Sequence, residues 1–150
     1  MKLNDFTDYT LRVLMYLAVA DDAPVSAQTI ADKFDISFHH VAKVAQWLAR
    51  SGYVSSQRGR GGGMKLAVPA SQISLGAIVR ATERDVAIVE CLKPGPGPIL
   101  CKLSPACLLE PTIREARDAF YASLDRKSLA DITENRVHLR RVLDLETLPA

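Results

Sequence analysis

Three cysteines carry the most reactive side chains of this chain, and they lie close together. Cys91, Cys101 and Cys107 are separated by nine and then five residues. An odd number of clustered thiols favours a metal centre or a redox role over a disulfide framework. The spacing matches neither the paired cysteines of structural zinc sites nor the C-x2-C-x2-C run of ferredoxins. We interpret them as three soft ligands. The fourth would be a non-cysteine residue, a small molecule or a group from a second subunit. Three idle thiols are the alternative.

The second group of residues with a chemical role is basic. No acidic residue occurs between Asp35 and Glu83. The formal net charge of the whole chain is only +2, so this segment of one sign indicates a surface for a polyanion. A solvated basic face is the alternative. The segment contains His39, His40, Lys43, Arg50, Arg58, Arg60, Lys65 and Arg80.

Apolar periodicity and capping residues predict the elements that position these side chains. Residues 7–20 predict a helix with Thr7 as its N-cap. Ser26 would cap a second, short helix, and Ser37 would cap a third that ends at Gly52. Two capped helices joined by a tight turn predict a helix-turn-helix. Residues 53–57 and 64–68 then predict two strands joined by a glycine-rich hairpin tip, which would form a wing.

The third helix would be the recognition helix, because such a helix presents its first residues to base edges in the major groove. Arg58 and Arg60 in the hairpin tip suit a narrow minor groove, where the negative potential is strongest. A flexible loop without a DNA contact is the alternative for such a glycine-rich tip. The same glycines resemble a nucleotide-binding loop, but no helix follows them, which excludes that interpretation. The predicted DNA-binding residues are Ser37, Phe38, His39, His40, Lys43, Arg58 and Arg60.

The second half of the chain predicts a sensor loop and a dimerisation helix. Ser74 would cap a helix that ends near Thr82, and residues 84–110, which contain all three cysteines, would form a long loop. Pro111 would open a helix that ends near Arg126. Its apolar positions form a seam for another helix, namely Ile113, Ala116, Phe120 and Leu124. We expect that helix to come from a second copy of the chain, and packing on the head of the same chain is the alternative.

The expected fold class is therefore mainly α with a small β-wing, a winged helix-turn-helix head followed by a long dimerisation helix. We expect a DNA-binding domain over residues 1–82, a cysteine-rich loop over 83–110 and a dimerisation helix over 111–132. The dimerisation region would include a short helix near 129–132. Residues 133–150 are charge-rich and predict a flexible tail.

Composition and motifs exclude other classes of protein. Hydrophobic residues make up 48% of the chain and charged residues 24%, which is ordinary for a globular protein. No apolar stretch is long enough to span a membrane, and the first residues do not resemble a signal peptide, so we expect a cytoplasmic protein. The sequence shows no recognisable Ser/His/Asp set, HExxH motif or P-loop, and no paired carboxylates in a pocket evident from the sequence, so we do not expect an enzyme.

Several segments resemble the Rrf-type winged-helix regulators, the group that includes the NsrR, IscR and RirA branches. They are residues 6–18 (FTDYTLRVLMYLA), 30–37 (IADKFDIS), 52–54 (GYV) and 58–63 (RGRGGG). The segments SPAC at 104–107 and SLADI at 128–132 look most like the NsrR branch, which comprises nitric-oxide-sensitive repressors. The resemblance covers about residues 1–132.

The resemblance implies an iron–sulfur cluster bound by Cys91, Cys101 and Cys107. In NsrR-like proteins an aspartate near the N-terminus of the other subunit is the fourth ligand, and Asp8 matches that position. Arg12 would then lie near the cluster. Taken from the residues alone, Asp8 and Arg12 could instead form a surface ion pair one helical turn apart. Where IscR-like proteins have a ligand histidine this chain has Glu110, which is a second candidate for the fourth ligand.

The function that this resemblance implies is a homodimeric repressor that binds a double-stranded DNA operator and responds to nitric oxide. A 4Fe–4S cluster is expected, with 2Fe–2S as the alternative. An iron- or redox-sensing cluster, or a thiol-based sensor, on the same fold is the alternative function. Two departures from the family pattern stand out. The gap between Cys91 and Cys101 is longer than usual, and His39 replaces a common asparagine.

Overall fold

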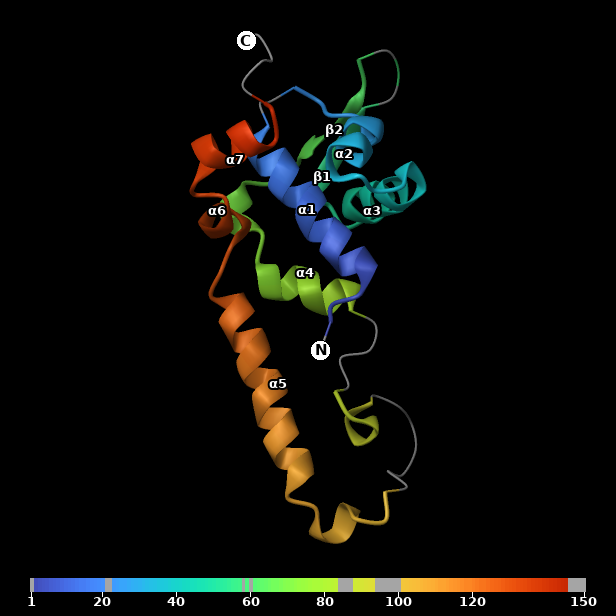
Figure 1. Cartoon of the computed structure of the whole chain (residues 1–150), viewed down its shortest axis with the longest axis vertical. Coiled ribbons are helices and arrows are strands. Elements are labelled where there is room, and N and C mark those ends of the chain that lie inside the picture. The colour runs from blue at the N-terminus through green and yellow to red at the C-terminus, as the bar shows by residue number, and fades with distance from the viewer. Residues whose placement is uncertain are drawn as a thin grey trace.

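The computed structural model describes residues 2–20, 23–57, 59, 61–83, 88–93 and 101–145. Most helices and both strands form a head, and one long helix, α5 (Leu109–Asp125), extends away from it (Figure 1). The short helix η3 (Ser104–Ala106) lies at the far end of α5, and η2 (Glu90–Leu92), which contains Cys91, lies beside α5 (Figure 1). In the described part of the chain, no helix is both long and apolar enough to span a membrane.

The head is built around α1 (Asp5–Val19), which packs against α3 (Phe38–Arg50), while α2 (Ala27–Phe34) packs on α3. Ser26 caps α2, as predicted, by accepting a hydrogen bond from the Thr29 backbone N–H at 3.0 Å. The connecting turn uses Asp35 in the left-handed region, at φ 51°. This arrangement confirms the predicted helix-turn-helix.

The start of α1 differs from the prediction. Asn4 is its N-cap, and its side chain accepts the Thr7 N–H at 2.8 Å. Thr7 is fully buried instead, and its hydroxyl donates to that of Thr82 at 2.8 Å. The capping prediction for Thr7 was therefore wrong, because a contact with a residue distant in sequence determines its role.

The wing consists of β1 (Val54–Gln57) paired antiparallel with β2 (Gly63–Leu66). A third backbone segment joins it, because Val25 and Met64 exchange two backbone hydrogen bonds of 2.9 and 2.8 Å. A Cβ at position 63 would lie 2.6 Å from the Val25 backbone. Only glycine therefore permits this close approach between β2 and the segment before α2.

After the wing, the chain adds η1 (Ala70–Gln72) and α4 (Leu75–Thr82) to the head and then continues through the cysteine segment to α5. Helix α4 packs below α1, with Ser74 as its predicted cap. Two short 3-10 helices follow, η2 (Glu90–Leu92) and η3 (Ser104–Ala106). The long helix α5 runs over Leu109–Asp125, so it begins two residues before Pro111.

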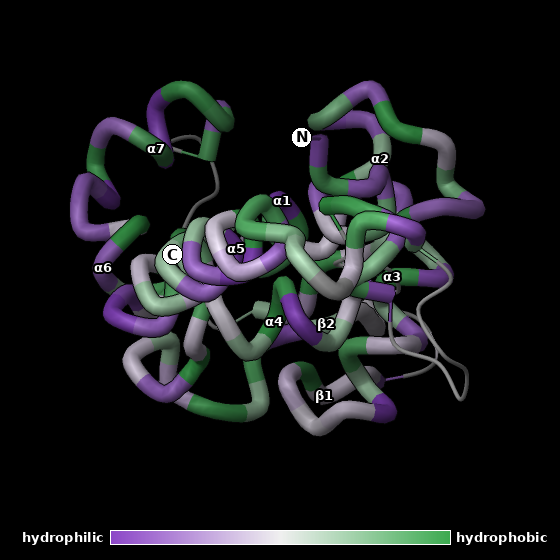
Figure 2. Tube along the Cα trace, turned by 90° about the horizontal axis from the view of Figure 1, so that it is seen from below, coloured by the Kyte–Doolittle hydropathy of each residue, from purple (hydrophilic) through white to green (hydrophobic). Residues whose placement is uncertain are grey.

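The C-terminal region contradicts the predicted flexible tail over residues 133–145. After α6 (Leu129–Ile132), the chain forms α7 (Arg136–Val142), and Leu145 is buried. Arg136 and Arg140 donate to the carbonyls of residues 18–20, where α1 ends. Guanidinium groups are favourable there, because the last carbonyls of a helix have no partner within it. Seen along α5, α6 and α7 lie on one side of α1, and α2 and α3 lie on the other (Figure 2).

This contact predicts that Arg140 stabilises the head. Its guanidinium donates to the Val19 carbonyl at 2.8 Å and to that of Leu145 at 3.0 Å. We expect Arg140→Met to lower the free energy of unfolding by about 1–2 kcal/mol, because partly buried charged hydrogen bonds are lost. Urea denaturation measures this change. Arg126→Met, at an exposed position after α5, is the control, and equal midpoints for the two variants would contradict the assignment.

Candidate DNA interface and cysteine site

The recognition helix α3 separates its buried and exposed sides as the sequence predicted. Val41, Val44 and Leu48 are fully buried and fix the helix on the head. The predicted DNA-binding residues on this helix are all exposed, namely Ser37, Phe38, His39, His40 and Lys43. The N-cap position is Ser37, although its side chain accepts no capping hydrogen bond. These side chains are therefore available to an external partner.

Three of these exposed side chains, Phe38, His39 and His40, have ring contacts that sequence reasoning did not find. The His39 ring lies edge-on to that of Phe38, at 5.9 Å between centroids. The His40 ring is stacked on Tyr9 of α1, with centroids 5.6 Å apart and an interplanar angle of 29°. The only sequence signal for Tyr9 is its place in an amphipathic helix, which does not identify the partner.

The wing tip is described only in part. Arg58 and Arg60, predicted to enter a minor groove, lie outside the described residues. Gly59 and Gly61 between and beside them have φ values of 104° and 79°, a region that side chains strongly disfavour. The glycines are therefore required by the conformation of the tip.

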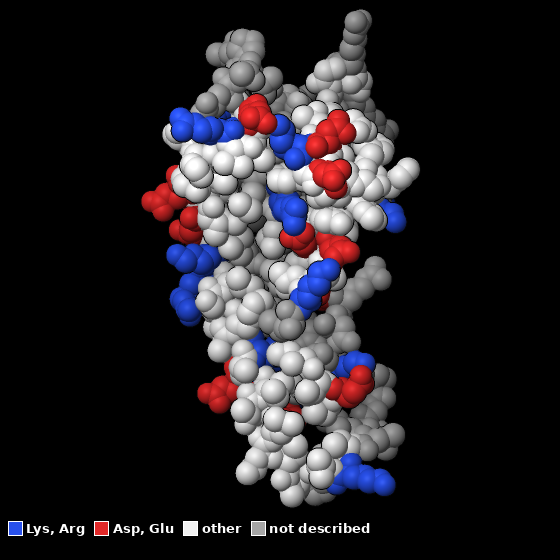
Figure 3. All heavy atoms as spheres, in the orientation of Figure 1, with Lys and Arg blue, Asp and Glu red and all other residues white. Residues whose placement is uncertain are grey.

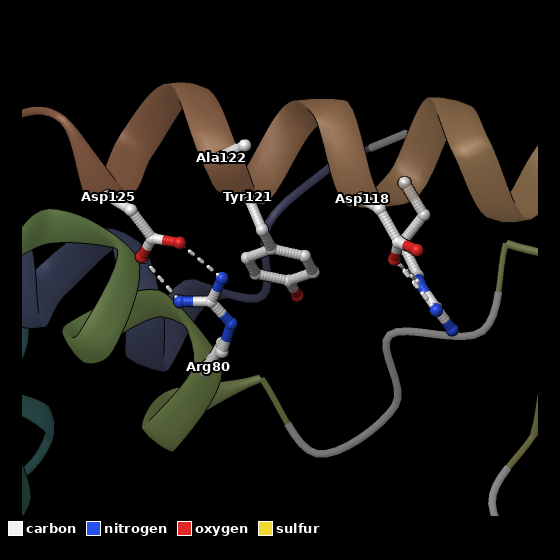
Figure 4. Close-up of a pocket in the computed structure, with 6 residues that line it drawn as sticks. Arg80, Asp118, Tyr121, Ala122 and Asp125 are labelled. Atoms are coloured by element: carbon white, nitrogen blue, oxygen red, sulfur yellow. Dashed lines mark hydrogen bonds and ion pairs between the residues drawn. The ribbon is translucent and has the colours of Figure 1, made fainter.

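One basic residue of the acid-free segment does not belong to a DNA-facing surface. Arg80 of α4 binds both carboxylate oxygens of Asp125 on α5, at 2.5 and 2.6 Å (Figure 4). This bidentate hydrogen bond lowers the pKa of Asp125 and raises that of Arg80. A Cβ on Gly76 would overlap the Asp125 carboxylate, so the glycine allows the two helices to meet. The pair joins the head to α5.

Tyr121 belongs to the same junction. Its ring lies under the Arg80 guanidinium, 4.5 Å from it, and only 6% of the residue is exposed. Burial and the nearby carboxylate of Glu83 raise the pKa of its phenol. The hydroxyl accepts and donates no hydrogen bond among the described residues, and it points away from the Arg80–Asp125 pair (Figure 4).

The three cysteines come from different local elements of the chain, and together they line one cavity of about 220 Å³. Cys91 belongs to η2, Cys101 precedes η3, and Cys107 lies just before α5. Ser104, Glu110 and Arg114 complete the lining. Glu110, the second candidate ligand, is therefore at the cavity, where its carboxylate is paired with Arg114 at 3.0 Å from the guanidinium Nε.

The cysteine thiols of this cavity are the type of ligand that holds iron–sulfur clusters. No group of three His, Cys, Asp or Glu side chains in the described residues is close enough to hold one metal ion. A cluster has several irons and spreads its thiolate ligands over a wider site. Three thiols and one carboxylate around one cavity are compatible with that wider arrangement.

The remaining predicted site residues, Asp8 and Arg12, are on α1. They form an ion pair of 2.8 Å, with 44% and 45% of the two side chains exposed. The sequence-based alternative, a pair one turn apart, is therefore present. Among the described residues that line the cysteine cavity of the same chain, Asp8 does not occur.

The helix-turn-helix, the paired strands of the wing and the exposed start of the recognition helix together define the class: the protein is a winged-helix DNA-binding regulator. The family model of Rrf2, described as an iron-dependent transcriptional regulator, matches residues 3–135, so the chain belongs to the Rrf2 family.

Similar proteins agree with this assignment. The chain is 40% identical to the HTH-type transcriptional regulator NsrR of Geobacillus kaustophilus over 144 residues, covering 95% of this chain and 97% of that one. It is also 40% identical to NsrR of Bacillus subtilis over 147 residues, covering 97% and 99%. Among solved structures, CymR, the global cysteine regulator of B. subtilis, has a TM-score of 0.69 at 26% identity, covering 90% and 98% of the chains. The fold of T. potens IscR is also similar, with a TM-score of 0.66 at 21% identity over 100% and 94%.

The Arg80–Asp125 pair predicts a pH-dependent stability. The folded state lowers the pKa of Asp125 below its ordinary value of 3.8. The stabilisation from the pair is therefore fully present above pH 3.8, and it is lost as the pH falls through the lowered pKa of the folded state. We expect Asp125→Asn to unfold at lower urea concentration than the wild type at pH 7, and the difference to shrink below about pH 4.

Asp118→Asn is the matched control, because the described hydrogen bonds of the Asp118 carboxylate come from its neighbour Arg117 on the same helix. Its effect should be smaller at pH 7. A constant difference between wild type and Asp125→Asn from pH 7 to pH 3 would contradict the assignment.

Proposed function

We propose that this chain is a homodimeric, DNA-binding transcriptional repressor whose iron–sulfur cluster senses nitric oxide, and that nitrosylation of the cluster releases the operator. One observation carries the proposal, namely the convergence of Cys91, Cys101 and Cys107 on a single cavity. Nearly full-length similarity to regulators named NsrR supports the choice of signal.

In this proposal, the exposed start of α3 reads the major groove. His39 and His40 would donate or accept hydrogen bonds at base edges, and Phe38 would contact a thymine methyl group. Lys43 would bind a phosphate or guanine. Arg58 and Arg60 of the wing tip would enter the adjacent minor groove. A dimer would read two half-sites about one helical turn apart.

The cluster would be held by the three cysteines and a fourth, carboxylate ligand. Asp8 of the partner subunit is the first candidate, with Arg12 beside it, and Glu110 is the second. We propose a 4Fe–4S cluster, as the similarity to NsrR regulators suggests. When bound, the cluster supplies iron that reacts with nitric oxide.

The homodimer would form along α5. This helix has 17 residues, but only Tyr121 among them is buried within the chain. The predicted seam of Ile113, Ala116, Phe120 and Leu124 is at best partly covered. Leu108 and Leu109 at its start are 83% and 61% exposed. The cysteine end of the molecule also carries few charged side chains on the face in Figure 3. Such a surface suits a second copy of the chain.

Helix α1 would couple the cluster site to the DNA-binding site. Asp8 lies in the first turn of α1, and α1 packs directly on the recognition helix. A bond from Asp8 to the partner subunit would hold the two heads at the separation that the operator requires. Release of Asp8 would let the heads move. A coupling free energy of about 1–3 kcal/mol would change operator affinity by about 5- to 150-fold.

The DNA contact predicts a specific salt dependence. If Lys43 neutralises a phosphate, Lys43→Gln should weaken binding to all sequences and reduce the slope of log affinity against log salt by about one. Fluorescence anisotropy with labelled duplexes, at salt concentrations from about 50 to about 200 mM, measures the slope. Lys127→Gln, exposed beyond α5, is the control and should leave it unchanged. Equal slopes for the wild type and Lys43→Gln would contradict a phosphate contact.

The nitric oxide response predicts different roles for two aspartates of α1. In anaerobic, cluster-loaded wild type, nitric oxide should lower operator affinity by about 5- to 150-fold. Asp8→Asn should lose most of this response and alter the absorption spectrum of the cluster. Asp5→Asn should keep both, because Asp5 pairs only with Lys2 among the described residues.

Glu110→Asn, tested in the same way, distinguishes the two candidate ligands. If Glu110 is the fourth ligand, its replacement changes the spectrum and that of Asp8 does not. An unchanged operator affinity of the wild type after complete nitrosylation would contradict nitric oxide sensing.

A thiol-based sensor is a second candidate function, because Cys101 is exposed while Cys91 and Cys107 are half-buried. An exposed thiol is open to oxidants. Iron and sulfide analysis of anaerobic protein separates the two functions. Protein without iron whose operator affinity changes with peroxide would favour the thiol-based sensor.

A further inference from the structure

The first two turns of α1 present two faces with different neighbours. Asp8 and Arg12 lie on an exposed face. Phe6 and Tyr9, three residues apart and so on one side of the helix, contact aromatic rings of α3. Phe6 meets Trp47 edge-on at 6.0 Å between centroids, and Tyr9 stacks on His40 at 5.6 Å. The residue next to the proposed ligand Asp8 therefore contacts the recognition helix.

His40 differs from its neighbours at the start of the recognition helix. The ring contact of His39 is with the adjacent Phe38, which is exposed and belongs to the same helix. Among the described aromatic contacts of this first turn, that of His40 alone reaches another element. An exposed imidazole normally samples several rotamers, whereas a stacked ring holds it in few orientations.

We infer that Tyr9 is a specificity-determining, positioning residue: its ring holds the imidazole of His40 in the orientation that reads a base edge. This inference rests on the proposed DNA-binding function and deepens it. Tyr9 acts through His40 and not on the DNA. A preorganised side chain binds with a smaller loss of rotamer freedom, so its removal weakens specific binding without changing phosphate contacts.

The test uses cluster-loaded protein and the consensus duplex that the wild type selects from a randomised DNA library. Tyr9→Leu should lower affinity for this duplex by about 2- to 10-fold, the range expected for one aromatic pair. Affinity for a scrambled duplex of equal length should stay unchanged. Tyr9→Phe keeps the ring and should restore wild-type discrimination. If Tyr9→Leu does not fold, Tyr9→Met keeps bulk without a ring and serves the same purpose.

A double-mutant cycle separates positioning from a general structural role. In a His40→Ala background, Tyr9→Leu should cause no further loss of discrimination, because both changes remove the same contact. Both single variants should lose preference at the same base pair of each half-site. Phe34→Leu is the matched control. It removes the edge-to-face contact of Phe34 with Tyr16, at 6.1 Å between α2 and α1, and should preserve base preference.

The outcomes distinguish this inference from the proposed function. Failure of the wild type to select any duplex would reject DNA binding itself. A wild type that selects a duplex, together with a Tyr9→Leu variant of equal discrimination, would overturn only the role of Tyr9. Additive losses in the double variant, or an equal loss on the scrambled duplex, would also overturn it, because either result indicates an effect independent of His40.

Discussion

The packing of α1 is the constraint on which the rest of this structure depends. One side of the helix buries Val13 and Leu14 in the core with α3, and its start is tied to α4 by the buried Thr7–Thr82 hydrogen bond. Its end is capped by guanidinium groups of α7. The recognition helix α3, helix α4 and the C-terminal helix α7 therefore all contact α1. A rigid helix fixed in this way can carry a displacement from one end of the head to another.

The long helix α5 is attached to the head mainly at its C-terminal end. Gly76, Arg80 and Tyr121 form that attachment together with Asp125, and η2 contacts the helix farther along. At about 1.5 Å per residue, α5 spans about 25 Å, so a small rotation at the junction moves the cysteine cavity by a larger distance. The bidentate Arg80–Asp125 geometry restricts such rotation, because both of its hydrogen bonds depend on orientation.

Local signals in the sequence predicted the elements well, and contacts between distant residues escaped it. The caps Ser26 and Ser74 and the left-handed Gly52 were all confirmed, since each depends on its immediate neighbours. The backbone pairing of Val25 with Met64 and the arginine caps from α7 leave no local pattern. Charge-rich residues after 133 resembled a tail because their partners are distant in sequence: Arg136 and Arg140 bind carbonyls at the end of α1, and Asp144 pairs with Lys33 of α2.

The same difference applies to the candidate site. Clustering along the sequence identified the cysteines, and the structure adds that Cys91, Cys101 and Cys107 meet at one cavity with Glu110. A count of basic residues included Arg80, whereas its partner Asp125 lies 45 residues away in the sequence and turns it from a DNA surface to a helix junction. The sequence did not identify Tyr9, because nothing in its local pattern distinguishes it from a core residue. An aromatic residue on an amphipathic helix normally belongs to the core, and only the position of His40 distinguishes it.

The exposed groups around the cysteine cavity favour a site completed by a second subunit. Cys101 is exposed, and Leu108 beside Cys107 is 83% exposed, although thiolate ligands of a cluster are normally shielded by apolar side chains. Asp8 stands on an exposed face of α1 with only Arg12 paired to it among the described residues. A second copy packed along α5 would cover the leucines, shield the thiols and supply a carboxylate from its own α1. One interface would thus link the chemistry of the cavity to the helix that positions the DNA reader.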